Sequence, residues 1–119
     1  MAVPTDVTIE SKRLADLEPP DLPAVVTLLR MLADPMRAAI LDRLATAELC
    51  VCHLQDVLGA KQTLVSHHLK ALRDAGLVDT EPSGRFTYYR LHPGAFDDVV
   101  DAVQGLAAAS RSALPKRPC

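Results

Sequence analysis

Two of the three cysteines stand one residue apart in the stretch ELCVCHL, residues 48–54, and a histidine follows them directly. Thiolates are soft ligands, so Cys50 and Cys52 are candidates for a shared metal or metalloid site. Two sulfurs on one ion must lie within about 4 Å of each other, given metal–sulfur bonds of about 2.3 Å. Residues i and i+2 diverge in a helix and share a side in an extended segment. The spacing therefore predicts a chain that is extended around Val51, or becomes so on binding.

Two other interpretations of the cysteine pair stay open at this point. Small cysteines can fill a core as hydrophobes, and an accessible pair can act as a redox or persulfide switch. The sequence opens without a signal-peptide pattern, and its apolar runs stay short of the roughly 20 residues that cross a bilayer. We therefore expect a cytoplasmic protein without a membrane partner, in which the thiols are reduced.

Catalysis has no support in the motifs of the sequence. It contains no C-x-x-C, no phosphate-binding glycine loop and no obvious acid–base pair. A closed structural zinc site is also disfavoured, because three cysteines without a paired Cys/His spacing do not supply four ligands. We therefore expect that the protein is not an enzyme.

The formal net charge of −2 hides an uneven distribution of charge. Residues 1–35 carry six acidic and three basic side chains, whereas residues 61–93 carry five basic and three acidic ones, together with three histidines. A locally basic segment on an acidic chain is a candidate footprint for a phosphate backbone. Because an ordinary solvated face can carry the same small excess of basic residues, charge alone does not decide whether this segment contacts nucleic acid.

The elements that must position these residues follow from apolar spacing and turn residues. Asp21 and Asp34-Pro35 mark two helix starts, and Gly59 and Gly76 mark two helix ends. We expect a flexible arm over 1–20 with one short helix near 11–17, a folded domain over 21–110 and a flexible tail over 111–119. The expected helices cover about 22–33, 35–46, 53–58, 63–75 and 95–108, and two strands flank a turn at Pro82-Ser83-Gly84.

The order of these elements defines a fold class. A short helix, a tight turn and a longer helix make a helix-turn-helix, and a hairpin directly after it makes a wing. The two outer helices carry more apolar surface than one small core needs, which predicts a twofold-symmetric homodimer. The sequence thus predicts a mainly α protein with a β-hairpin wing, a homodimeric winged helix-turn-helix.

Four stretches in this order carry a resemblance to a known family: LADPMRAAILDRL, ELCVCHL, QTLVSHHLKALRDAGLV and GRFTYYRL. Over roughly residues 24–106 the chain resembles the ArsR/SmtB family of bacterial metal-responsive repressors, and ELCVC looks like its arsenic- and antimony-responsive branch. The resemblance implies a dimer that binds double-stranded operator DNA when metal-free. It implies release of the DNA by arsenite or antimonite, with cadmium, lead or a thiol redox signal as alternatives.

Some positions depart from the common pattern of that family. Lys61 stands where a capping serine is usual before the recognition helix, and Thr63 can itself cap that helix. His53 replaces a common aspartate, and Gln55 stands where some members place a third cysteine. The third ligand of the metal site is therefore left open.

The polar face of the expected 63–75 helix, with the residue just ahead of it, is the predicted contact with DNA. Residues near its N-terminus would touch base edges in a major groove, and Lys70 would meet phosphate. An exposed polar face without a partner is the alternative. The residues expected to contact DNA are Gln62, Thr63, Ser66, His67, Lys70 and, at the hairpin tip, Arg85. His68 is expected in the core with a hydrogen bond.

Trivalent arsenic or antimony prefers three sulfurs, and the chain offers two locally. Cys119 is the third cysteine, and the tail from Arg111 spans up to about 30 Å if extended. A free terminal thiol is the favoured alternative, with water, a small thiol or another anion completing the shell. Closing an ion between Cys50 and Cys52 would unwind or tilt the helix turn that follows, and a position near a helix N-terminus predicts a lowered thiol pKa.

Overall fold

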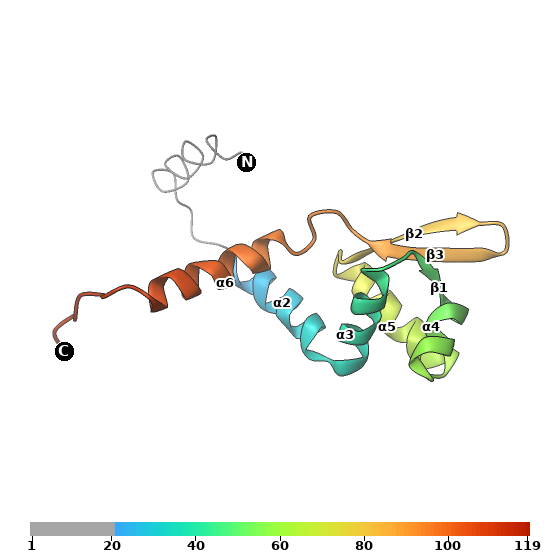
Figure 1. Ribbon diagram of the computed structural model, residues 1–119, viewed down its shortest axis with the longest axis horizontal. Coiled ribbons are helices and arrows are strands. Elements are labelled where there is room, and N and C mark those ends of the chain that lie inside the picture. Colours follow the sequence, from blue (N-terminus) through green and yellow to red (C-terminus); the bar gives the residue numbers. More distant parts are fainter. Residues whose placement is uncertain (1–20) are drawn as a thin grey trace.

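The computed structural model describes residues 21–119, so the predicted arm over 1–20 and its short helix lie outside the described residues. Figure 1 shows α3, α4 and α5 gathered beside a small sheet, with α6 alongside α2 at the other end. This arrangement confirms the predicted winged helix-turn-helix. The elements are α2 (Leu22–Ala33), α3 (Pro35–Leu44), β1 (Leu49–Cys50), α4 (Val51–Leu58), α5 (Gln62–Asp74), β2 (Val78–Ser83), β3 (Phe86–Leu91) and α6 (Asp97–Ser110).

Aspartates cap the first two helices at the predicted positions. The Asp21 carboxylate accepts a hydrogen bond from the backbone N–H of Ala24 at 3.3 Å. The Asp34 carboxylate accepts two, from Met36 at 2.9 Å and Arg37 at 3.1 Å. In α3 the proline follows the cap at the first helical position, where the missing N–H costs nothing. Both predicted helix starts are confirmed.

The core lies where α3, α4 and α5 meet the sheet. Each helix contributes apolar residues at helical spacing, the buried cluster is aliphatic, and Tyr89 and Phe96 pack against it from outside. The predicted inner stripe of the recognition helix is fully buried, with Val65, Leu69 and Leu72 each 0% exposed. The core cluster is Ile40, Leu41, Leu44, Leu54, Val65, Leu69, Leu72, Leu77 and Val78.

The sheet has the strand order β1-β3-β2, and all pairs are antiparallel. Gly84, at φ 61°, and Arg85 form a two-residue turn between β2 and β3. The predicted turn over Pro82-Ser83-Gly84 therefore began two residues too early, because Pro82 and Ser83 belong to β2. An edge strand tolerates this proline, since its outer side makes no ladder hydrogen bonds.

Three helix starts differ from the prediction. The recognition helix α5 begins at Gln62 with Lys61 as its N-cap, so Thr63 lies inside the helix and does not cap it. The last helix begins at Asp97 instead of residue 95, because Gly94 at φ 75° continues the preceding turn. The third boundary, at α4, concerns the cysteine pair and is described with it below.

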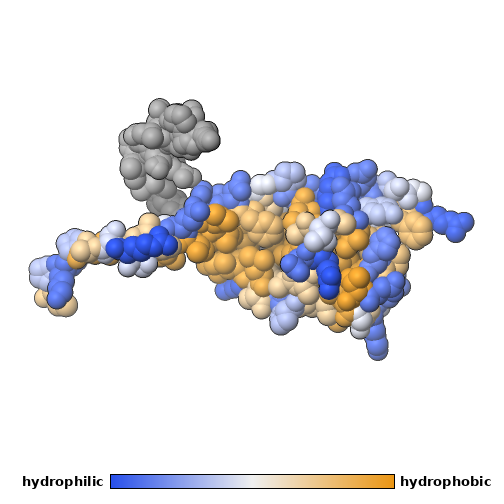
Figure 2. Space-filling model, in the orientation of Figure 1, coloured by the Kyte–Doolittle hydropathy of each residue, from blue (hydrophilic) through white to orange (hydrophobic). Residues whose placement is uncertain are grey.

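Apolar side chains stay exposed on the two outer helices, as the sequence predicted. Figure 2 shows them gathered over α2 and the adjoining part of α6. Half or more of the Val103 and Leu106 side chains is exposed, at 50% and 73%. Leu22, Val26, Leu29 and Val100 are also exposed on these helices. In residues 21–119 no helix combines the length and apolar character needed to cross a membrane.

Candidate metal centre and nucleic-acid interface

Cys50 belongs to two elements at once, as the last residue of β1 and the N-cap of α4. Its backbone is extended, at φ −93° and ψ 172°, and the helix begins at the next residue, Val51. The prediction of a helix starting near residue 53, after an extended Val51, was therefore wrong. Sulfur is a weak acceptor, and Cys is not among the preferred N-cap residues, so local residue preferences do not predict a helix start here.

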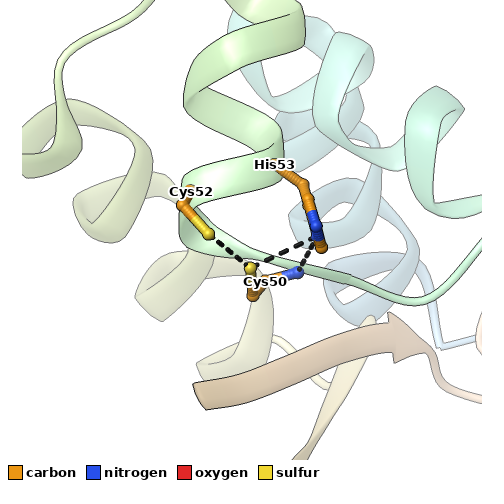
Figure 3. A group of neighbouring side chains, drawn as sticks. All are labelled: Cys50, Cys52 and His53. Carbon is orange, nitrogen blue, oxygen red and sulfur yellow. Dashed lines mark hydrogen bonds between the residues drawn. The ribbon is translucent and has the colours of Figure 1, made fainter. Parts of the chain in front are cut away.

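The two neighbouring sulfurs nevertheless converge. The Sγ atoms of Cys50 and Cys52 lie 2.7 Å apart, and both cysteines are free thiols (Figure 3). An N-cap side chain turns back over the first helical turn, which is where the side chain of Cys52 stands. The requirement for an extended chain was thus too strict, because a cap followed by a helix also brings i and i+2 together.

His53 completes a group of three donors that the sequence analysis did not assign. Its Nδ1 atom lies 3.2 Å from the Cys50 sulfur and accepts a hydrogen bond from the Cys50 backbone N–H at 3.3 Å (Figure 3). The latter bond is the returning half of a capping box, made by the third residue of the helix. Within residues 21–119 the possible ligand atoms of Cys50, Cys52 and His53 form a group with separations below 4.8 Å.

The pKa values of the two thiols are shifted in opposite directions. Burial of Cys50 opposes its ionisation, but hydrogen bonds from the Cys52 thiol and from backbone N–H groups prevail and lower the pKa of Cys50. The hydrogen bond to Cys50 raises the pKa of the exposed Cys52. Cys50, at the N-terminus of α4, therefore loses its proton more readily than Cys52 does, as expected of a cysteine in that position.

The wing is in contact with this site. Cys50 pairs with Tyr88 of β3, and the rings of His53 and Tyr88 lie 6.3 Å apart, centre to centre. Tyr88 also lines a hollow of about 260 Å³ together with Glu48, Glu81 and Ser83. A change at Cys50 therefore acts directly on both α4 and β3.

Cys119 is not part of this group. It is exposed at the end of a tail that has no helix or strand after residue 112. Figure 1 shows that this tail leads away from α6 at the end of the molecule opposite α4. Within one chain the structure does not bring Cys119 to the other two cysteines.

The residues predicted to contact DNA lie together on the outer face of α5. Gln62, Thr63 and His67 are exposed and Ser66 is partly exposed. Lys70 is also exposed, and its ammonium is bound to the Asp74 carboxylate at 2.9 Å. This pair lowers the pKa of Asp74. The i, i+4 spacing could have identified the pair in advance.

Arg85 and His68 are also found where they were predicted. Arg85 is exposed in the turn at the tip of the wing. His68 is 8% exposed, and its Nδ1 atom lies 3.5 Å from a guanidinium nitrogen of Arg37 on α3. His68 therefore packs between helices, which confirms its predicted place in the core.

A helix-turn-helix with a three-stranded wing and an exposed polar recognition helix defines the winged-helix class of DNA-binding proteins. The family described as "Bacterial regulatory protein, arsR family" matches residues 34–80. The arsenical resistance operon repressor of Staphylococcus aureus is 39% identical over 74 residues, which cover 62% of this chain and 71% of that one. The chain thus belongs to the ArsR family of bacterial transcriptional regulators.

Further relatives agree with this assignment. The transcriptional repressor SmtB of Mycobacterium tuberculosis is 50% identical over 70 residues, 59% of this chain and 52% of that one. The cadmium resistance regulatory protein CadC of Listeria innocua is 36% identical over 70 residues, 58% of this chain and 59% of that one. The chain thus spans only a little over half the length of these two relatives.

A solved structure shows the same fold. It is the homodimeric winged helix-turn-helix DNA-binding domain of a possible ArsR-family regulator from Mycobacterium bovis. The sequences are 30% identical, the TM-score is 0.57, and the match covers 82% of this chain and 88% of that one.

Proposed function

We propose that this protein is a transcriptional repressor that binds operator DNA as a homodimer and is released when arsenite or antimonite binds Cys50 and Cys52. The observation that carries the proposal is the approach of the two sulfur atoms to 2.7 Å at the start of the first helix of the helix-turn-helix. A thiophilic inducer that binds these soft sulfur ligands therefore binds at the start of α4, the helix that must move for DNA to be released.

The binding step is a ligand exchange without oxidation or reduction. Arsenous acid gives up two of its three hydroxyl groups, two As–S bonds form, and the thiol protons leave with the hydroxyls as two molecules of water. The remaining hydroxyl can stay on arsenic, so that the third position needs no third cysteine. The lowered pKa of Cys50 favours its attack as a thiolate, because the thiolate is the nucleophile.

The same step alters the start of α4. Cys50 is the N-cap, and its sulfur becomes a weaker acceptor for backbone N–H groups once one of its electron pairs is bonded to arsenic. Leu54 on α4 and Leu69 on α5 belong to one buried cluster. A tilt of α4 therefore moves the recognition helix, and with it the spacing of the two recognition helices across a dimer.

The DNA-binding and dimer surfaces lie on different parts of the chain. Gln62, Thr63, Ser66 and His67 would approach base edges, while Lys70 and Arg85 would approach phosphates. The exposed apolar residues of α2 and α6 would be covered by the partner subunit. Such a repressor acts on the chromosome, so we place it in the bacterial cytoplasm.

Operator binding with and without arsenite tests the function. Fluorescence anisotropy under anaerobic conditions should show release of the wild type from the labelled upstream DNA of its own gene. Cys52→Ser should bind the DNA equally well and lose release, since Cys52 is exposed and its replacement disturbs no packing. Cys119→Ser is the matched control and should behave as the wild type.

Three outcomes would contradict parts of this proposal. Unchanged release of Cys52→Ser would remove the cysteine pair from the mechanism. Loss of release in Cys119→Ser would make Cys119 the third ligand. Release by oxidant alone, with a matching mass change on the thiols and no response to arsenite, would identify the pair as a redox or persulfide switch.

A further inference from the structure

His53 stands where a third metal ligand would stand, and its chemistry differs from that of the two sulfurs. Its Nδ1 atom lies 3.2 Å from the Cys50 sulfur and belongs to a three-donor group with Cys50 and Cys52. Two thiolates and one imidazole are the donor set of divalent d¹⁰ cations. They leave a fourth tetrahedral position for water.

The hydrogen bonding of the imidazole also fits a ligand. Nδ1 accepts the backbone N–H of Cys50, so this ring nitrogen already acts as an acceptor, as a metal ligand must. At 3.3 Å this hydrogen bond is long, and a cation can displace the N–H with little loss. His53 is exposed, so the ring can adjust without disturbing the core.

We propose that His53 is the third ligand, through Nδ1, of a divalent thiophilic cation such as Cd²⁺ bound to Cys50 and Cys52. Arsenite does not need this donor, because arsenic keeps a hydroxyl group in its third position. The imidazole therefore separates two classes of inducer at one pair of thiols. This inference rests on the proposed function, since it uses the same cysteines as the inducer site.

The geometry adds a consequence for α4. Nδ1 cannot serve the cation and the Cys50 N–H at the same time, so a bound cation removes the returning half of the capping box. Arsenite takes only the sulfurs and leaves that hydrogen bond intact. The two inducers therefore weaken the start of α4 by different routes.

One substitution can separate the ligand from the cap. Glutamine at the third position of a helix is a normal capping-box residue, so His53→Gln keeps an acceptor for the Cys50 N–H. It replaces the imidazole with an amide oxygen, which is a poor ligand for a soft cation. His92→Gln is the matched control, because His92 is exposed on another segment and bound to Asp79 at 2.9 Å.

The experiment is a titration of the full chain, free of DNA, with Cd²⁺ and separately with arsenite, following the thiolate-to-metal absorption. The dissociation constant of His53→Gln for Cd²⁺ should be about 100-fold higher than that of the wild type. Its dissociation constant for arsenite should stay within about threefold of the wild-type value. His92→Gln should match the wild type with both. The cadmium NMR shift should move in His53→Gln as a nitrogen ligand is replaced by oxygen.

Two results would overturn the inference. Equal Cd²⁺ affinity of His53→Gln and the wild type would show that the imidazole is not a ligand. An equal loss for Cd²⁺ and arsenite would show that His53 acts only by positioning the cysteines. Failure of the proposed function is a separate result, since it appears as arsenite binding that does not release DNA.

Discussion

The helices α3 and α4 begin with the same arrangement made from different chemistry. At α3 a carboxylate caps two backbone N–H groups, a proline fixes the first helical residue, and Arg37 donates to the carbonyls of Arg30 and Met31 at 3.1 and 3.0 Å. At α4 the cap is the sulfur of Cys50, and the returning hydrogen bond to His53 is 3.3 Å long. The start of α3 is therefore held by a strong hydrogen-bond acceptor, and the start of α4 by weak ones.

The difference shows that one small domain can contain a helix start with strong capping hydrogen bonds next to one with weak capping hydrogen bonds. Carboxylate caps accept strong hydrogen bonds and have little affinity for soft ions. Thiolate caps accept weaker ones and bind soft ions in preference to backbone groups. In both helices buried residues, such as Ile40 in α3 and Leu54 in α4, pack in the shared core, so a tilt at either start is passed to the neighbouring helices.

The largest expected effect comes from making the start of α4 resemble that of α3. Cys50→Ser supplies a preferred capping hydroxyl and removes one of the two sulfurs. We expect DNA affinity within about threefold of the wild type and an arsenite concentration for half-release that rises at least about 100-fold. Operator anisotropy measures both. An unchanged half-release concentration would mean that the soft cap is not the responsive element.

A smaller effect is expected when each cap is removed in turn. Asp34→Ala should lower the Tm by roughly 4–8 °C, because two backbone N–H groups lose a charged acceptor. His53→Ala should lower the Tm by less than half as much, since it removes one long hydrogen bond at an exposed residue. Differential scanning calorimetry of the three proteins compares them. An equal fall in Tm for the two variants would show that the caps of α3 and α4 stabilise the fold equally.

The smallest effect is a pH dependence in the acid range, which the carboxylate cap of α3 should show. Hydrogen bonds from the backbone of Arg37 and Met36 lower the pKa of Asp34 below 3.8. A carboxyl whose folded pKa lies below its unfolded value stabilises the fold above that unfolded value, and this contribution is lost as the pH falls through the folded pKa.

Asp34→Asn is the matched variant for this prediction, because asparagine also caps a helix but does not titrate. Its Tm should fall less than that of the wild type between pH 5 and pH 3, as measured by circular dichroism. Parallel curves for the two proteins would show that Asp34 contributes nothing to the acid sensitivity of the fold.

Much of the fold could be predicted because its signals are local. The Asp-Pro start of α3 and the glycine end of α4 follow from backbone preferences of single residues, and the apolar stripe of α5 follows from spacing. The start of α4 could not be found in this way, because cysteine is a poor signal for a cap. The turn of the wing shifted for a similar reason, since an edge strand accepts a proline that usually indicates a turn.

The candidate site was predicted in its residue types and not in its geometry. The soft character of Cys50 and Cys52 follows from composition alone, but their approach depends on the cap conformation of one residue. The part played by His53 depends on a side chain that turns back to the start of its own helix. The position of Cys119 depends on the path of a tail without regular structure, which local patterns do not describe.

Strand β1 has only two residues, and this limits how the backbone at Cys50 can change. Leu49 pairs with Tyr89 and Cys50 with Tyr88, and Leu49 and Tyr89 both pack against the core. A slip of the strand by one residue would turn Leu49 out of the core, because successive side chains point to opposite faces. The strand thus has one register, so a change at Cys50 cannot be taken up by a slip of β1 along β3. If the proposed inducer binds there, the start of α4 is the part of each subunit left to move.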